Sequence, residues 1–250
     1  MQWLVVANWK MNPGTAAAAL SLFEATKKAS EKARNATIII APPAIFLPRL
    51  RTSYRGKKVQ FGIQHGHFEH SGSYTGEISL TQAKDAGASW AIIGHAERRA
   101  VGETDEDVCK QVVRALTLKM TPILCIGEKV RSASGDHLHF IKEQLRIGLA
   151  DVSPAKLGKI VIAYEPVWAI GAAEAMQPRD MHEMAIFIRK TIVDTHGKPG
   201  LSVKILYGGS IDETNAGAML REGDVQGLLV GRASADAAQF AHLVSAIEKA

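Results

Sequence analysis

The 250-residue sequence contains only two cysteines, Cys109 and Cys125, and neither belongs to a Cys-x-x-Cys pair. This scarcity argues against a disulfide framework and against a cysteine-based zinc site, and it fits a reducing compartment. The sequence also lacks an apolar run long enough to span a bilayer, and no basic segment precedes a long apolar one. We therefore expect a cytoplasmic protein with no signal peptide and no membrane partner.

Blocks of positive charge are also missing. The formal net charge is +5, but lysine and arginine are scattered along the chain. Proteins that bind nucleic acids usually gather their positive charge on one face or element. The pattern argues against a nucleic-acid partner and favours the attraction of small anionic substrates.

Short apolar runs rich in Val, Ile and Leu alternate with helical segments along the whole chain. Runs of this kind are typical of strands buried on both faces of a parallel sheet. We expect strands at residues 3–7, 37–41, 58–63, 90–93, 121–126, 159–163, 203–207 and 226–230. We expect helices at residues 14–34, 44–54, 80–86, 137–149, 212–221 and 236–248, and two more that begin near Thr104 and Pro178. Eight such units predict an α/β fold, a closed (β/α)₈ barrel (TIM barrel) with residues 1–250 as a single domain; a doubly wound open sheet is the alternative.

A carboxylate follows the sixth predicted strand. Glu165 comes directly after Ala163-Tyr164, and Pro166 then ends the strand because it has no N–H to donate. Low dielectric disfavours a charged carboxylate and makes it a stronger base. An apolar pair and a tip of small residues come next, so the segment reads as a base joined to a lid. The alternative is a surface salt bridge followed by an ordinary loop.

Polar residues also follow the first and fourth predicted strands, where this class of barrel carries its chemistry. Asn8 and Lys10 are expected to project together and to hold an anionic or oxygen-rich ligand. His95 stands where a short helix begins, and the partial positive charge of a helix N-terminus disfavours an imidazolium there. A neutral imidazole can donate a hydrogen bond to a carbonyl. We expect Glu97 to pair with Lys10, and the two arginines after it to bridge neighbouring loops.

Glycine-rich segments follow the last strands. Gly208-Gly209-Ser210 follows the seventh strand, Gly231-Arg232 follows the eighth, and Gly171 lies at the tip of the lid. Glycine lets the backbone approach a ligand closely, and exposed N–H groups bind phosphate. The loops after strands seven and eight are the usual phosphate site of this fold.

Together these residues resemble those of the triosephosphate isomerase family. The matching segments are Asn8-Trp9-Lys10-Met11-Asn12, Thr75-Gly76-Glu77-Ile78-Ser79, Ile93-Gly94-His95, Glu97-Arg98-Arg99, Cys125-Ile126-Gly127-Glu128, Ala163-Tyr164-Glu165-Pro166-Val167-Trp168-Ala169-Ile170-Gly171, Tyr207-Gly208-Gly209-Ser210 and Leu229-Val230-Gly231. They span the chain and fall at the expected strand ends.

The resemblance implies an aldose–ketose isomerase of glycolysis and gluconeogenesis that interconverts dihydroxyacetone phosphate and D-glyceraldehyde 3-phosphate through an enediolate, with no cofactor and no metal. It implies that Glu165 is the base and that neutral His95 is the electrophile. It makes Lys10 and Asn8 the groups that position substrate and stabilise negative charge, with Glu97 supporting Lys10.

The resemblance also implies where the phosphate and the lid lie. The phosphate would be held by the backbones at Gly171, Ser210, Gly231 and Arg232. The lid would consist of Pro166, Val167, Trp168, Ala169, Ile170, Gly171, Ala172, Ala173, Glu174, Ala175 and Met176.

The long loop at residues 64–79 carries no chemistry of its own. In the family such a loop inserts into a second subunit, and its end is kept here as Thr75-Gly76-Glu77. The resemblance therefore implies a homodimer, with a tetramer as the alternative. Without it, a loop of this length reads as a disordered excursion. Phe68 and Tyr74 argue against disorder, because aromatic side chains usually find a surface to pack on.

Four features depart from the family pattern. Ala96 replaces a common Ser, His65 replaces Asn, and Arg232 replaces Gly. The lid tip at residues 172–176 also differs. We expect Ala96 to alter the resting position of Glu165, and His65 to make dimerisation sensitive to pH. Two other functions stay open at this point: a sugar-phosphate barrel with another reaction, and a non-catalytic scaffold.

Overall fold

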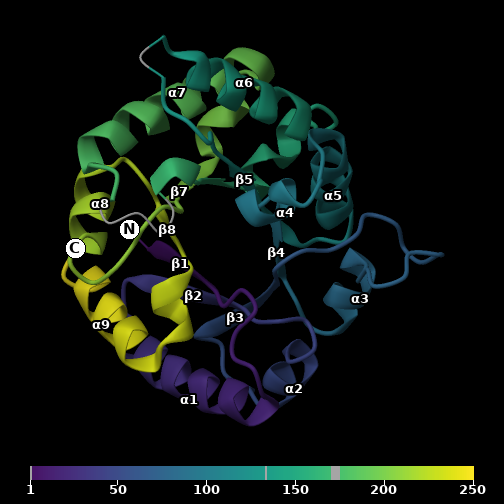
Figure 1. The fold of residues 1–250 in the computed structure, drawn as a ribbon, viewed down its shortest axis with the longest axis vertical. Coiled ribbons are helices and arrows are strands. Elements are labelled where there is room, and N and C mark those ends of the chain that lie inside the picture. The colour runs from purple at the N-terminus through teal and green to yellow at the C-terminus, as the bar shows by residue number, and fades with distance from the viewer. Residues whose placement is uncertain (1, 133, 170–174) are drawn as a thin grey trace.

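The chain forms one closed barrel of eight parallel strands, in sequence order around the ring (Figure 1). The computed structural model describes residues 2–132, 134–169 and 175–250. The strands are β1 (Trp3–Asn8), β2 (Ala36–Ala41), β3 (Val59–Ile63), β4 (Trp90–Ile93), β5 (Thr121–Ile126), β6 (Val161–Tyr164), β7 (Lys204–Tyr207) and β8 (Gly227–Val230). Pairing of β1 with β8 closes the ring, with Ala7 opposite Val230. The predicted (β/α)₈ barrel is confirmed.

Alternate residues of each strand pack on opposite sides of the barrel wall. In β1, Leu4 and Val6 belong to a cluster made only of strand residues, which fills the barrel interior. Val5 and Ala7 belong to the larger cluster shared with the helices. Both faces of the strands are therefore buried, which explains why their sequences are apolar throughout.

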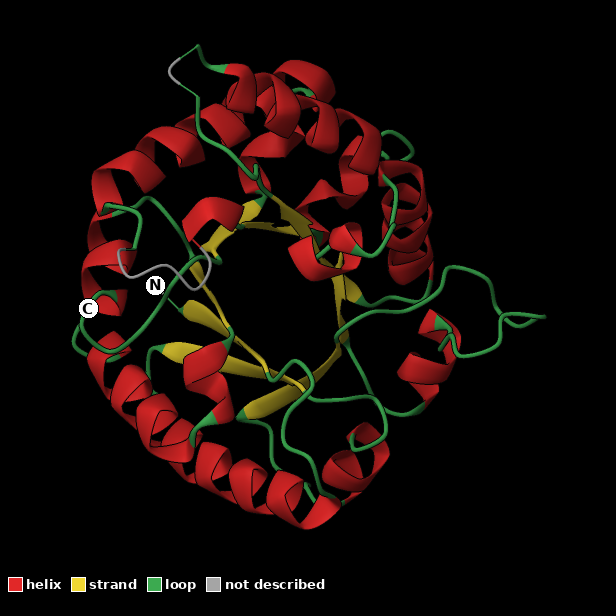
Figure 2. Cartoon of the chain, viewed as in Figure 1, coloured by secondary structure: helices red, strands yellow, loops and turns green. Residues whose placement is uncertain are grey.

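Helices form a ring outside the strands (Figure 2). They are α1 (Ala16–Lys32), α2 (Leu47–Thr52), α3 (Leu80–Asp85), α4 (Ala96–Ala100), α5 (Asp105–Thr117), α6 (Asp136–Gly148), α7 (Pro178–His196), α8 (Ala216–Glu222) and α9 (Ala237–Ile247), with short 3₁₀ segments at Pro154–Lys159, Val167–Ala169, Lys198–Ser202 and Arg232–Ala235. Thr104 and Asp107 form the capping box that starts α5, as the sequence predicts.

Several boundaries differ from the sequence prediction. β6 ends at Tyr164 and α8 begins at Ala216, later than expected in both cases. The Asp212 carboxylate accepts hydrogen bonds from the backbone N–H groups of Thr214 and Asn215. Those bonds form a turn where a helix was expected. The 3₁₀ segments are too short to show a distinct hydrophobic periodicity, so the sequence does not predict them.

The loop at residues 64–79 extends away from the barrel between β3 and α3 (Figure 1). Its base is fixed because His67 N donates to the Ile78 carbonyl and Leu80 N donates to the His67 carbonyl. The His67 ring lies 4.4 Å from the Phe68 ring and 4.2 Å from the Tyr74 ring, centroid to centroid. The aromatic residues thus pack within the loop itself. Across the three described ranges, no helix combines the length and apolar character that a bilayer crossing needs.

Candidate active site

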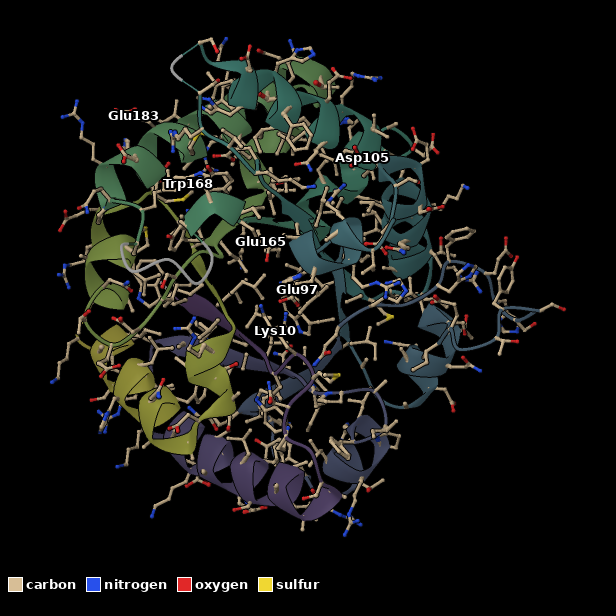
Figure 3. All side chains as sticks on the ribbon, in the orientation of Figure 1. Lys10, Glu97, Asp105, Glu165, Trp168 and Glu183 are labelled. Carbon is tan, nitrogen blue, oxygen red and sulfur yellow. The ribbon has the colours of Figure 1, made fainter. Side chains whose placement is uncertain are left out.

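The mouth of the barrel contains a cavity of about 380 Å³ at the carboxyl ends of the strands. Its walls combine residues from the loops after β1, β4, β6, β7 and β8. They are Asn8, Lys10, Asn12, His95, Glu165, Gly208, Gly209, Ser210, Ile211, Asp212, Leu229, Gly231, Arg232, Ala233 and Gln239. The structure therefore brings together the polar residues that the sequence predicts. Figure 3 shows Lys10, Glu97 and Glu165 at this mouth.

Glu165 and His95 form a buried pair in the cavity. The Glu165 Oε1 atom lies 3.0 Å from His95 Nε2, and both side chains are less than one-tenth exposed. The other carboxylate oxygen accepts a hydrogen bond of 3.1 Å from the backbone N–H of Ala96. Glu165 is thus held by the first turn of α4 even though Ala96 has no hydroxyl.

His95 is oriented by the same turn. Its Nδ1 atom accepts a hydrogen bond of 3.2 Å from the backbone N–H of Glu97. An imidazole nitrogen that accepts a hydrogen bond carries no proton, so the ring has the geometry of the neutral form with its proton on Nε2. That proton points toward Glu165 and into the cavity.

Two opposing influences act on the His95 pKa. Burial is the largest single influence and lowers this pKa, but the Glu165 carboxylate raises it, and the net direction is upward from 6.5. The carboxylate 3.0 Å from Nε2 thus opposes the influence that the sequence predicts from the helix N-terminus. Substrate that separates the two side chains would remove the raising influence.

Lys10 also lines the cavity, and contacts fix both its side chain and its backbone. Its Nζ atom pairs with Glu97 Oε1 at 2.6 Å, which places the predicted pair in contact. Its backbone has φ of 52°, and its N–H donates to Asn8 Oδ1 at 3.1 Å. The Gln64 side-chain amide donates to the carbonyls of Lys10 and Ala41 at 2.7 and 2.9 Å. The sequence does not predict this role of Gln64, since nothing in its neighbours marks an amide that reaches the loop after β1 and the end of β2.

The first hinge of the lid is anchored to a buried carboxylate. Glu128 accepts hydrogen bonds from Tyr164 Oη and from Trp168 Nε1, the second at 2.9 Å. Its carbonyl accepts from Val167 N at 3.0 Å. Gly127 precedes it, and a Cβ there would lie 1.8 Å from the Glu165 carbonyl oxygen. Only glycine fits where the two loops approach this closely. Glu128 is a second residue that sequence reasoning gave no role.

Of the predicted lid, residues 166–169 and 175–176 are described. Val167–Ala169 form a 3₁₀ turn, and Met176 is buried. The predictions for residues 170–174, including Gly171, fall outside the described residues.

The predicted phosphate end of the cavity combines Gly209, Ser210, Gly231 and Arg232. The Ser234 hydroxyl contacts the carbonyls of Asn8 and Gly231 at 3.2 and 2.7 Å, which joins the loop after β8 to the end of β1. Arg232, which stands where the family has glycine, belongs to the cavity lining. Within the described residues, no group of three or more His, Cys, Asp or Glu side chains is arranged to hold a metal ion.

Comparisons with known proteins agree with this geometry. A sequence model of the family described as Triosephosphate isomerase matches residues 3–247. A triosephosphate isomerase of Endomicrobium trichonymphae is 38% identical over 243 residues, which covers 96% of this chain and 97% of the relative. The enzyme of Granulibacter bethesdensis is 39% identical over 249 residues, with 98% and 99% covered. That of Aquifex aeolicus is 38% identical over 246 residues, again with 98% and 99% covered.

Proposed function

Since this chain belongs to the triosephosphate isomerase family, we propose that Glu165, His95 and Lys10 carry out the family reaction at the barrel mouth. The enzyme interconverts dihydroxyacetone phosphate and D-glyceraldehyde 3-phosphate. In the proposed mechanism, Glu165 takes a proton from the carbon next to the carbonyl. The proton returns to the neighbouring carbon, the hydroxyl proton passes from one substrate oxygen to the other, and an enediolate exists in between.

His95 is the proposed electrophile. Its Nε2–H faces the cavity, so it can donate a hydrogen bond to a substrate oxygen once Glu165 turns toward carbon. A fixed neutral donor stabilises charge that develops on that oxygen in the transition state. The contact between Nδ1 and the Glu97 N–H supports this role, because it keeps the proton on Nε2.

Lys10 and Asn8 are proposed to position the substrate and to stabilise its negative charge. Glu97 holds the Lys10 ammonium at the cavity. The backbones at Ser210, Gly231 and Arg232 are proposed to bind the phosphate, together with Gly171 of the lid. Binding energy from the phosphate is available to close the lid, which excludes water from the enediolate.

The observation that carries these roles is the buried contact of Glu165 Oε1 with His95 Nε2 at 3.0 Å inside a cavity that also contains Lys10. A base, an electrophile and a cation meet there without a metal ligand set among the described residues. A coupled assay of triose phosphate interconversion tests the proposal. An inactive parent enzyme would favour the non-catalytic scaffold.

Changing Ala96 to serine is expected to alter kcat by less than about tenfold, roughly 1.4 kcal/mol. The Ala96 backbone N–H already holds Glu165 Oε2, so a hydroxyl adds a second contact to a carboxylate that is already fixed. Steady-state kinetics of Ala96→Ser beside the parent measure the change. A gain of a hundredfold would mean that the backbone contact alone leaves Glu165 badly placed.

We also propose that the enzyme acts in the cytoplasm as a homodimer, with Thr75, Gly76 and Glu77 inserted into the second subunit. The extended loop supports this, because its residues 71–77 are exposed in the single chain. Sedimentation is expected to give twice the chain mass, and association is expected to be weaker at about pH 5.5 than at about pH 8, because a histidine, His65, lies at the base of this loop. Equal affinity at both pH values would reject the pH dependence, and a monomer would reject the dimer.

A further inference from the structure

His65 lies outside the active-site cavity, two residues after β3, between two carboxylates. Its Nε2 atom is 2.9 Å from Glu77 Oε2, and its Nδ1 atom is 3.0 Å from Glu103 Oε1. The imidazole is 19% exposed and the Glu103 side chain 3% exposed. The Nε2 contact has hydrogen-bond geometry, whereas the Nδ1 atom only lies close to its carboxylate, so the Nδ1 contact is attractive as an ion pair when the ring is protonated.

A third charged group faces the same ring. Arg98 Nη2, from α4, lies 3.3 Å from His65 Nε2 and 3.9 Å from Glu77 Oε1. A guanidinium only donates hydrogen bonds, so it can donate to Nε2 only when that atom is unprotonated. When the ring is protonated, Nε2 therefore pairs with Glu77. When Nε2 is unprotonated, it accepts a hydrogen bond from Arg98.

The Glu103 carboxylate is suited to remain charged beside this ring. Burial alone would raise the pKa of Glu103, but the contacts with His65 and Gln111 and the Arg98 charge hold it below its usual value. Gln111 from α5 donates to Glu103 Oε1 at 2.8 Å. The carboxylate on the Nδ1 side thus stays fixed, while the partner on the Nε2 side changes with protonation.

On the Nε2 side, Arg98 belongs to α4, the helix that begins at the active-site residue His95. α4 has a single turn and contributes no buried residue, so its position depends on tethers from its side chains and ends. Arg98 is one such tether, and its carbonyl accepts from Glu103 N at 3.1 Å. The same turn begins at His95 and carries Glu97, the partner of Lys10 Nζ.

The neighbour of His65 acts on the same lysine from the other end. Gln64 donates to the Lys10 carbonyl at 2.7 Å. Gln64 therefore contacts the Lys10 backbone directly. His65 is connected to the Lys10 side chain through Arg98 and Glu97, which both belong to α4.

We propose that His65 is a positioning residue of the isomerase, whose protonation state sets how firmly α4 holds His95 and the Glu97–Lys10 pair. The groups that face it are Glu77 from the loop at residues 64–79, Glu103 from the segment before α5, and Arg98 from α4. The inference rests on the proposed roles of Lys10 and His95.

The test is the pH profile of kcat/KM for His65→Gln beside the parent enzyme. Glutamine keeps one donor and one acceptor but cannot become a cation, so it fixes the neutral arrangement. The parent-to-variant ratio of kcat/KM is expected to change at least about threefold between about pH 5.5 and pH 8.5. Titration of the substrate phosphate is common to both enzymes and cancels in the ratio. A ratio that stays constant across this range would overturn the proposal.

His182→Gln is the matched control, because His182 is exposed on α7, outside the loop at residues 64–79. Its ratio to the parent is expected to be constant. If His65→Gln does not fold, NMR of the parent enzyme provides the second test. The chemical shift of the Arg98 side-chain N–H is expected to follow the protonation of the His65 ring. An Arg98 shift that stays constant while the His65 ring signals change would reject the coupling.

The two proposals fail in different ways. A Glu165→Gln variant that is as active as the parent would reject the catalytic roles whatever happens at His65. A constant His65→Gln ratio in an enzyme that needs Glu165 would reject only the positioning role.

Discussion

Glu165→Gln is expected to lower kcat by about 10²–10⁴-fold, the range that a positioned general base contributes. The amide has nearly the shape of the carboxylate, so the packing around this buried position is kept. Its oxygen can still accept the Ala96 N–H, but the side chain can no longer take a proton from carbon. The coupled assay measures kcat, and the thermal midpoint shows whether the variant is folded.

Glu183→Gln is the matched control for this variant. Glu183 lies on α7 at the periphery of the barrel (Figure 3), and it pairs with Arg179 at 3.5 Å with both side chains exposed. The same chemical change there is expected to leave kcat unchanged. A Glu165→Gln enzyme that turns over as fast as the Glu183→Gln enzyme would mean that another group removes the proton.

Glu165→Gln has a second readout in the His95 pKa. The Glu165 carboxylate raises this pKa, whereas burial and the Lys10 charge lower it. The variant is therefore expected to show a lower His95 pKa by NMR. In the parent, the His95 pKa is higher in the folded state than the ordinary 6.5. Protonation of His95 therefore stabilises the folded state below pH 6.5, and this stabilisation is lost as the pH rises through the pKa of the folded state. The stability difference between parent and variant is thus expected to be larger at acid pH.

The position of the site could be predicted from the sequence because the barrel brings all strand ends to one rim. Once eight buried strands are recognised, Asn8, His95 and Glu165 must approach one another even though long stretches of sequence separate them. The pairing of Lys10 with Glu97 follows from the same rule together with opposite charge. These predictions needed only the order of the strands and the residue that follows each one.

Other parts of the site depend on distances that no single segment determines. Glu128 reads as a surface carboxylate, but it is buried and accepts hydrogen bonds from Tyr164 at the end of β6 and from Trp168 in the following loop. Gln64 gains its role from two carbonyls, one on the loop after β1 and one at the end of β2. The influence of Glu165 on the His95 pKa could not be predicted from the segment around His95, because this carboxylate follows another strand.

Lys10→Met is expected to lower kcat/KM by about 10²–10³-fold, as the loss of one fixed group that stabilises developing charge does. Methionine keeps most of the apolar stem, and like lysine it has a Cβ, so it adds no new cost at the backbone φ of 52°. Glu97 loses its partner but is 60% exposed, so water can solvate the free carboxylate. The expected loss is therefore one of charge in the cavity rather than one of folding.

The division of this loss between kcat and KM tells what Lys10 does. If Lys10 binds substrate and transition state equally, KM rises and kcat is unchanged; if it acts on the developing charge, kcat falls as well. We expect both to change, because Nζ lies beside the cavity that holds His95 and Glu165. Lys27→Met is the control, since Lys27 pairs with Glu24 on α1, away from the barrel mouth. Equal kcat/KM in the two variants would remove Lys10 from the mechanism and leave the phosphate to be bound by backbone N–H groups and Arg232.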